Sequence, residues 1–183
     1  MNGRETRAAL EELGIKALKG MGQNFLVNPL AAEKIAAALG SRPVSVLEIG
    51  PGLGALTGKL IEAGHTVSAV ELSGELAGWV ENRFPEVAVV QGDFLQVKPD
   101  SVPGYPFRAV ASNLPYNISS QAVLKLCETE YSHVDTAVLM LQREMAERLG
   151  CLLGGREYGR LSLMVWPWFS VTKLFDLSPG EFM

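Results

Sequence analysis

The motif Asn113-Leu114-Pro115-Tyr116 has the side chains best suited to chemistry in this sequence. It follows an apolar run, residues 107–112, which is typical of a buried strand, so we expect the motif where that strand ends. An asparagine amide both donates to and accepts from the edge of an adenine, and a tyrosine ring offers a face for stacking. Proline has no N–H and a fixed φ, so the two middle carbonyls can face one guest. The motif indicates a base pocket, although it also suits an ordinary strand-to-helix turn.

A glycine-rich loop lies between a predicted strand and a predicted helix further upstream. Its residues Gly50, Gly52 and Gly54 allow positive φ and let a ligand approach the backbone closely. Taken as Gly50-x-Gly52-x-x-Ala55, the loop matches the dinucleotide fingerprint, and Glu71 follows about 20 residues later, where an acid binds ribose hydroxyls. The loop predicts a cofactor that contains adenosine, and it leaves NAD and S-adenosylmethionine both open.

A second acidic residue, Asp93, comes directly after another predicted strand. Its carboxylate can accept a hydrogen bond from an adenine amino group, and Phe94 can flank the ring. On its own, Asp93 indicates only a turn or a helix cap. Glu71, Asp93 and Asn113 end three strands of one predicted sheet, so we expect them to be near neighbours. They would then offer one carboxylate to a ribose, one to an adenine and an amide to a second guest.

Strand and helix signals alternate along the whole chain, which predicts a single domain with a parallel α/β fold. The predicted strands are 44–49, 66–70, 87–90, 107–112, 134–141 and 169–175, and the predicted helices are 5–13, 29–39, 55–63, 74–83, 119–128 and 142–149, with a further helical stretch at 158–161. The second helix has the clearest limits, because Asn28 suits an N-cap, Pro29 suits N1 and Gly40 suits the stop.

The composition fits a soluble globular protein, with 48% hydrophobic and 20% charged residues. No apolar run approaches the ~20 residues that span a bilayer, and we expect a cytoplasmic protein. The cysteines Cys127 and Cys151 and the histidines His65 and His133 are isolated from one another, so we expect no metal site. The net charge of −4 argues mildly against a nucleic-acid partner, but a local basic face is compatible with it.

Together the motifs resemble the KsgA/RsmA family of small-subunit rRNA adenine N6,N6-dimethyltransferases over nearly the whole chain. The blocks that carry the resemblance are Gln23-Asn24-Phe25-Leu26, Glu48-Ile49-Gly50-Pro51-Gly52-Leu53-Gly54, Glu71, Gly92-Asp93, Asn113-Leu114-Pro115-Tyr116-Asn117, Leu141-Gln142-Arg143-Glu144 and Tyr158-Gly159-Arg160-Leu161-Ser162. The resemblance implies a class I, Rossmann-like methyltransferase fold with a mostly parallel sheet and helices on both faces. It also implies S-adenosylmethionine as methyl donor and dimethylation of two adjacent adenosines near the 3′ end of small-subunit rRNA, in ribosome biogenesis.

The same resemblance implies roles for individual residues. The implied cofactor-binding residues are Gln23, Asn24, Leu26, Glu48, Gly50, Gly52, Gly54, Glu71, Leu72, Gly92, Asp93, Phe94 and Asn113. The implied catalytic residues are Asn113, Leu114, Pro115, Tyr116 and Phe182. In this scheme residues 1–26 close over the cofactor, Asn113 bridges the cofactor and the target base, and Tyr116 and Phe182 stack on the two faces of a flipped-out adenine.

The resemblance further implies that residues 1–183 form the catalytic domain and that the family's C-terminal helical domain is absent. The expected partner is small-subunit rRNA in a pre-30S particle, without a membrane or a metal, and we expect a monomer. Candidate phosphate contacts are Lys16, Lys19, Arg143, Arg148, Arg156 and Arg160, each of which equally suits an ordinary solvated surface.

Three other functions remain open from the sequence. The nearest is an Erm-type enzyme, which methylates an adenosine of large-subunit rRNA on the same fold. A non-catalytic RNA-binding assembly factor is the second, and the intact Glu71, Asp93, Asn113 and Tyr116 argue against it. An NAD-dependent dehydrogenase rests on the glycine loop alone and leaves the Asn-Leu-Pro-Tyr motif without a role.

Overall fold

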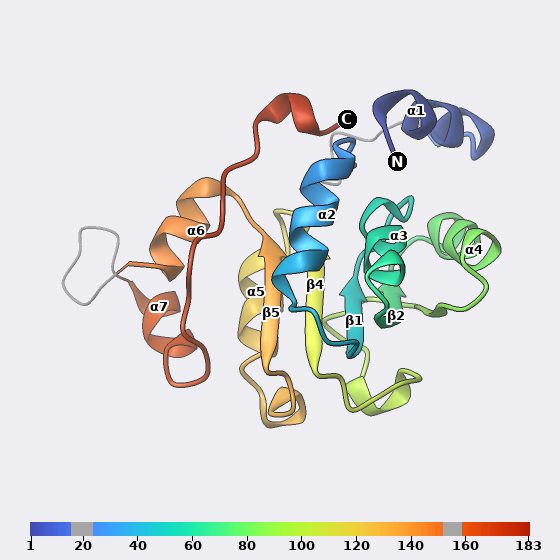
Figure 1. Cartoon of the computed structure of the whole chain (residues 1–183). Coiled ribbons are helices and arrows are strands. Elements are labelled where there is room, and N and C mark those ends of the chain that lie inside the picture. The colour runs from blue at the N-terminus through green and yellow to red at the C-terminus, as the bar shows by residue number, and fades with distance from the viewer. Residues whose placement is uncertain (16–23, 152–158) are drawn as a thin grey trace.

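A five-stranded parallel sheet forms the centre of the protein, in a computed structural model that describes residues 1–15, 24–151 and 159–183 (Figure 1). The strands are β1 (Ser45–Ile49), β2 (Thr66–Glu71), β3 (Ala88–Gln91), β4 (Ala109–Asn113) and β5 (Thr136–Met140). Their order in the sheet is β3-β2-β1-β4-β5, and every neighbouring pair is parallel. The predicted parallel α/β fold is therefore confirmed.

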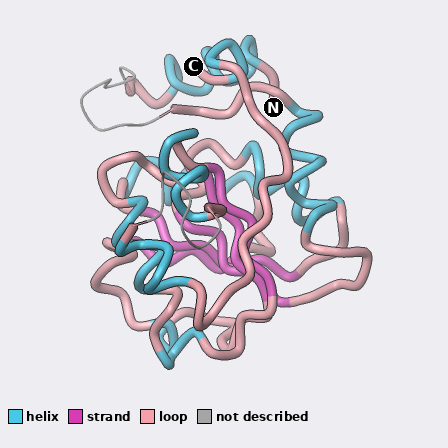
Figure 2. Tube along the Cα trace, turned by 90° about the vertical axis from the view of Figure 1, so that its left-hand side faces the viewer, coloured by secondary structure: helices cyan, strands magenta, loops and turns pink. Residues whose placement is uncertain are grey.

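Helices cover both faces of this sheet, as Figure 2 shows from the side. They are α2 (Pro29–Ala38), α3 (Ala55–Glu62), α4 (Gly74–Arg83), α5 (Ser119–Lys125), α6 (Arg143–Leu149) and α7 (Arg160–Val165). Helix α1 (Gly3–Glu12) lies beyond the end of the sheet, where it packs against Phe25, Leu53 and Leu76 (Figure 1). Successive residues of β1 point to opposite layers: Val46 packs in a core cluster with residues of α2, α3 and α4, whereas Leu47 packs with residues of α5, α6 and α7. Both faces of the strands are buried, which is why they are continuous apolar runs in the sequence.

The helix ends follow from local hydrogen bonds. Asn28 caps α2, since its Oδ1 accepts from the backbone N–H of Leu30 at 2.9 Å and of Ala31 at 3.2 Å. Pro29 stands at N1, where a missing N–H does no harm. Such a cap contributes about 0.5–2 kcal/mol to stability. The cap predicted at Asn28 is therefore confirmed. Ser73 caps α4, since its Oγ accepts from the Leu76 N–H at 3.4 Å.

The predicted strand at 169–175 is wrong, because this segment forms no strand. Phe169 packs against the core cluster on one face of the sheet, and Phe175 packs against the cluster on the other face. The segment therefore crosses beside the edge strand β5, rather than aligning with it, on its way from α7 to the C-terminus (Figure 1). An apolar run becomes a strand only where a neighbour supplies hydrogen bonds. The helical stretch predicted at 158–161 lies partly outside the described residues, and α7 begins at Arg160.

Within the part of the chain that the structure describes, no helix has the length and apolar character needed to cross a membrane.

Candidate cofactor and base-binding site

The carboxyl ends of the strands bring the candidate residues to one edge of the sheet. The last residue of β1, Ile49, pairs with Val70 of β2 on one side and with Ser112 of β4 on the other. Glu71 pairs in turn with Gln91, the last residue of β3. The expectation that these strands end as near neighbours is confirmed, and the glycine loop leaves β1 at the centre of that edge.

The glycine loop is held in place by Glu71. Gly50, Gly52 and Gly54 all have positive φ, at 65°, 57° and 82°, which only glycine adopts without strain. The Glu71 carboxylate accepts from the Gly52 N–H at 3.0 Å through Oε2 and from the Ser73 N–H at 3.0 Å through Oε1. Each carboxylate oxygen has a second lone pair, so this buried acid can still accept hydrogen bonds from a ligand.

Two other expected cofactor residues flank Glu71. Leu72 is 69% exposed directly after the strand, which places an apolar side chain at the rim of the candidate site. Gly92 donates its N–H to the Glu71 carbonyl at 2.8 Å. A Cβ on Gly92 would lie 2.9 Å from the Val97 side chain, so close packing requires glycine here.

Glu48 is a buried residue of β1, two positions before the glycine loop begins. Its side chain is 1% exposed, and its Oε2 has no hydrogen-bond partner among the described residues. Burial raises the pKa of the Glu48 carboxyl to about 8, and the nearby Glu71 carboxylate adds to the shift. Glu48 is therefore a neutral acid at pH 7 in the folded protein, beside a second acid that holds the loop.

Asp93 organises the turn that follows β3. Its Oδ1 accepts from the Leu95 N–H at 2.9 Å, and its Oδ2 accepts from the Gln96 Nε2 at 3.0 Å. This is the turn-capping role that the residue type alone favoured. Phe94 is only 4% exposed and packs against Tyr131, with ring centroids 6.1 Å apart. The acid is thus half-buried at the sheet edge, while the aromatic ring belongs to the core.

The amide of Asn113 has a fixed orientation at the end of β4. Its Nδ2 donates to the Asn24 carbonyl at 2.6 Å, so its Oδ1 points away from that carbonyl. Nothing else in the described ranges donates to this Oδ1. Asn113 therefore presents an acceptor to the site, and the backbone of Asn24 determines which end of the amide is presented.

The carbonyls of Leu114 and Pro115 differ in their availability. The Pro115 carbonyl accepts from the Ser119 Oγ at 2.8 Å and from the Ile118 N–H at 3.2 Å, at the start of α5. The Leu114 carbonyl accepts no hydrogen bond from any residue that the structure describes, and its side chain is buried to 2% exposure. Of the two carbonyls that the sequence left open, Leu114 supplies the free acceptor. Tyr116 stands next to it with 46% of its surface exposed.

The segment that follows Asn24 is paired with the last three residues of the sequence. Phe25 and Met183 exchange backbone hydrogen bonds of 2.9 Å in both directions, and Leu26 forms an antiparallel bridge with Phe182. A side-chain bond of 2.7 Å from Asn28 to Glu181 extends this pairing. Glu181 was not predicted as a site residue, since its partner is 153 positions away. Gln23, another predicted cofactor residue, lies outside the described residues.

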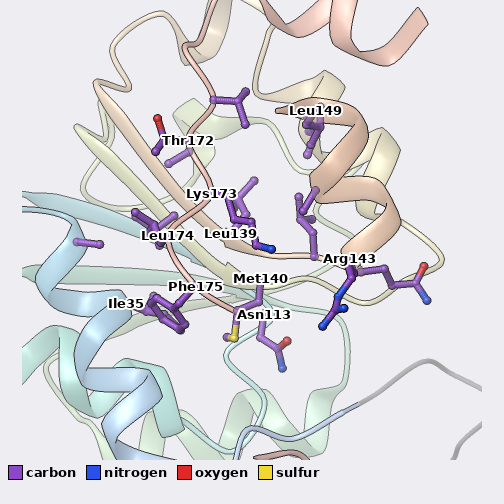
Figure 3. Close-up of a pocket in the computed structure, with 18 of the residues that line it drawn as sticks. Ile35, Asn113, Leu139, Met140, Arg143, Leu149, Thr172, Lys173, Leu174 and Phe175 are labelled. Atoms are coloured by element: carbon purple, nitrogen blue, oxygen red, sulfur yellow. The ribbon is translucent and has the colours of Figure 1, made fainter. Parts of the chain in front are cut away.

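A cavity of about 1050 Å³ opens beside β5, and the base-binding motif lines one end of it. Asn24, Asn113, Tyr116 and Phe182 all contribute to its wall. Figure 3 shows Asn113 next to Met140, with Arg143 close by at the start of α6. The glycine loop, Glu71 and Asp93 do not line this cavity, so it lies on the Asn113 side of the candidate site.

Charged residues around the cavity are solvated and mostly paired. Asp176 lies 2.8 Å from the Lys173 Nζ and 3.8 Å from the Arg143 Nε. Arg160 is exposed at the start of α7. Arg148 is exposed in the last turn of α6. The remaining three predicted phosphate contacts, Lys16, Lys19 and Arg156, lie outside the described residues. Among the residues that are described, no group of three or more His, Cys, Asp or Glu is placed to hold a metal ion.

The parallel order β3-β2-β1-β4-β5, with a glycine loop after β1 and an acid at the end of β2, is a Rossmann-like arrangement, and the solved methyltransferases that it resembles make it a class I methyltransferase fold. The family model for "Ribosomal RNA adenine dimethylase" matches residues 15–182. The chain belongs to this ribosomal RNA adenine dimethylase family.

Individual relatives agree with this assignment. A "Ribosomal RNA small subunit methyltransferase A" from Porphyromonas gingivalis is 37% identical over 172 residues, which cover 92% of this chain and 66% of the relative. A dimethyladenosine transferase from Plasmodium falciparum superposes with a TM-score of 0.62 at 33% identity, covering 78% of this chain and 52% of that one. The 23S rRNA methyltransferase ErmE gives a TM-score of 0.65 at 34% identity, covering 79% and 57%. The chain thus spans just under two thirds of the length of the curated relative.

Proposed function

We propose that this chain is the catalytic domain of an S-adenosylmethionine-dependent methyltransferase that converts two adjacent adenosines of small-subunit rRNA to N6,N6-dimethyladenosine. The observation that carries the proposal is the geometry of Asn113. Its Nδ2 is committed to the Asn24 carbonyl, so its Oδ1 and the carbonyl of the next residue, Leu114, are two acceptors at the end of β4 to which no described residue donates. An adenine amino group has two N–H donors, which match these two acceptors.

The residues at the sheet edge fit the cofactor. The positive-φ glycine loop permits close approach of the methionine end, and Glu71 retains lone pairs for the ribose hydroxyls. Exposed Leu72 and half-buried Asp93 suit the face and the amino edge of the cofactor's adenine. When bound, S-adenosylmethionine supplies an electrophilic methyl group. In the proposal, the segment up to residue 26 closes over it.

The chain's own residues act on the target base. An adenine amine is a poor nucleophile because its lone pair is delocalised into the ring. When Asn113 Oδ1 and the Leu114 carbonyl accept its two N–H bonds, the nitrogen moves toward tetrahedral geometry and its lone pair turns toward the methyl group. The new N–C bond would form as the methyl–sulfur bond breaks, with a neutral thioether as leaving group, and the methylated nitrogen would lose one proton to water. This is catalysis by placement and fixed dipoles, without a strong base.

Stacking holds the base in that position. Extruding a base from a helix costs a few kcal/mol, and stacking on Tyr116 returns roughly 1–3 kcal/mol. Phe182 lines the same cavity as Tyr116 and Asn113, which supports its proposed place on the opposite face of the base. Phe182 is anchored there by its bridge to Leu26.

Small-subunit rRNA is the proposed substrate because the curated relative from Porphyromonas gingivalis is named for that subunit. The similarity to ErmE, a 23S rRNA methyltransferase, makes large-subunit rRNA the alternative. We take the working partner to be a pre-30S particle in the cytoplasm, and the protein to act as a monomer.

A comparison of Asn113→Ala with a distant asparagine variant tests the proposal. Asn82→Ala serves as the control, since Asn82 is exposed on α4 and its side chain bonds to one described residue, through the Gly78 carbonyl. We expect Asn113→Ala to lose methyl transfer to unmethylated small subunits by at least about a hundredfold, as removal of a preorganised polar group does. Its affinity for S-adenosylmethionine, measured by calorimetry, should stay within a few fold. Wild-type turnover in Asn113→Ala would overturn the proposed mechanism.

A further inference from the structure

We infer that Lys125, at the end of α5, is a positioning residue for the cofactor site: it fixes the turn that presents Asp93. The inference rests on the proposed function and adds to it a residue that no motif marks. Its ammonium donates to carbonyls of this turn, so we assign it a role in holding the turn and not a role as a ligand of the cofactor.

Each of the three N–H donors of the Lys125 ammonium has a backbone carbonyl as partner. Its Nζ donates to the carbonyls of Phe94 at 2.8 Å, Leu95 at 3.0 Å and Val97 at 2.8 Å. An ammonium group has three N–H donors, so the three carbonyls saturate it. The same Nζ lies 5.2 Å from the centroid of the Phe94 ring, within cation–π distance.

The turn needs these bonds because its carbonyls have no strand partner. The Asp93 carboxylate accepts from one backbone N–H of the turn, that of Leu95, and from the side-chain amide of Gln96. Lys125 binds the C=O groups. The turn is therefore held by two charged side chains: Asp93 accepts from its donors and Lys125 donates to its carbonyls. Removing either side chain leaves partly buried polar groups of the turn unpaired.

The electrostatics of Lys125 agree with this geometry. Burial lowers the pKa of the Lys125 ammonium, and the carboxylates of Glu128, Asp93 and Glu130 act in the opposite direction. Those carboxylates stabilise the charged form, which is the form with three donors.

The helix α5 connects this turn to the base-binding motif. Its first residue, Ser119, donates to the Pro115 carbonyl at 2.8 Å, and its last residue is Lys125. A seven-residue helix is a rigid element about 10 Å long. One end of α5 is thus bonded to the turn beside the cofactor and the other to the motif that receives the base.

Substituting Lys125 by Met tests the inference, because methionine keeps an unbranched apolar stem and removes all three donors. Lys98→Met is the matched control, since Lys98 is exposed at the far end of the same loop. We expect Lys125→Met to raise the Kd and KM for S-adenosylmethionine about tenfold, as expected for the loss of charge-assisted hydrogen bonds, with kcat at saturation within about twofold. Lys98→Met should leave all three constants unchanged.

A double-mutant cycle separates positioning from general stability. If Lys125 acts through Asp93, Lys125→Met should weaken cofactor binding much less in an Asp93→Ala background than in the wild type. Should Lys125→Met fail to fold, Lys125→Arg replaces it in the cycle, and a smaller increase in Kd is expected because a guanidinium cannot reach the three carbonyls in the same way.

An unchanged Kd in the Lys125 variant would overturn the inference, and so would full additivity with Asp93→Ala. A fall in kcat without a change in KM would do so as well. Failure of the wild-type protein to bind S-adenosylmethionine would instead contradict the proposed function, so the two failures are distinguishable.

Discussion

The buried acid Glu48 gives a prediction whose size follows from the structure. Glutamine has nearly the shape of a neutral glutamic acid, so Glu48→Gln keeps the packing and removes the proton that can dissociate. The pKa of Glu48 is about 8 in the folded protein, against an ordinary value of 4.5 in the unfolded chain. Between these two pH values the folded wild type retains a proton that the unfolded chain has lost.

The sign follows from proton linkage. Because the pKa is raised by folding, the contribution of Glu48 to stability is fully present below pH 4.5 and is lost as the pH rises to about 8. Each pH unit in that window lowers the free energy of unfolding by about 1.4 kcal/mol. From pH 5 to pH 7 the wild type should lose about 3 kcal/mol through this one group. Glu48→Gln does not share that loss.

Urea unfolding at pH 5, 6 and 7, followed by circular dichroism, measures the difference. We expect the stability of Glu48→Gln relative to the wild type to rise by about 3 kcal/mol over this range. Glu86→Gln is the control, because Glu86 is exposed and its curve should run parallel to that of the wild type. Parallel curves for Glu48→Gln as well would show that Glu48 is ionised in the folded state and would refute the reasoning.

Two further predictions concern residues that support the site, Gly54 in the glycine loop and Asn28 at the start of α2. Gly54→Ala should lower the free energy of unfolding by about 2–4 kcal/mol, because φ is 82° and the new Cβ would lie 2.4 Å from the Phe84 ring. Gly78→Ala is the control: Gly78 has open space around it in α4, so this change should raise the free energy of unfolding by up to about 1 kcal/mol. Similar melting temperatures for the two variants would contradict this packing. Asn28→Ala should lower the free energy of unfolding, measured in urea, by about 1–3 kcal/mol, since it removes both the cap of α2 and the bond to Glu181. It should also slow methyl transfer, because the segment that orients the Asn113 amide becomes less ordered. Full activity in this variant would show that the segment does not orient Asn113.

Local signals explain why much of the fold was predictable. The limits of α2 follow from Asn28, Pro29 and Gly40, which act within one turn of the chain, and the helix runs from Pro29 to Ala38 as this pattern predicts. Three strand-end residues were expected together because carboxyl ends of parallel strands share an edge. The register of β1 with β2 and β4 confirms that expectation.

The features that the sequence did not predict depend on contacts between residues far apart in the chain. The run from Phe169 to Phe175 has a strand-like composition, but no pattern within it shows whether a neighbouring strand is in place. The Asn113 bond to Asn24 joins residues 89 positions apart, and the Lys125 bonds span 28 to 31 positions. A single lysine or asparagine carries no signal of its partner, so only the folded chain shows these contacts.

The most direct test of the proposed function is nucleoside analysis of rRNA after incubation with this protein and labelled S-adenosylmethionine. Unmethylated small and large ribosomal subunits would be supplied separately, and the products separated by mass spectrometry. We predict labelled N6,N6-dimethyladenosine at two adjacent positions of small-subunit rRNA and no label in large-subunit rRNA. Label in large-subunit rRNA alone, or no transfer from protein that binds the cofactor and is presented with small subunits, would contradict the proposed function.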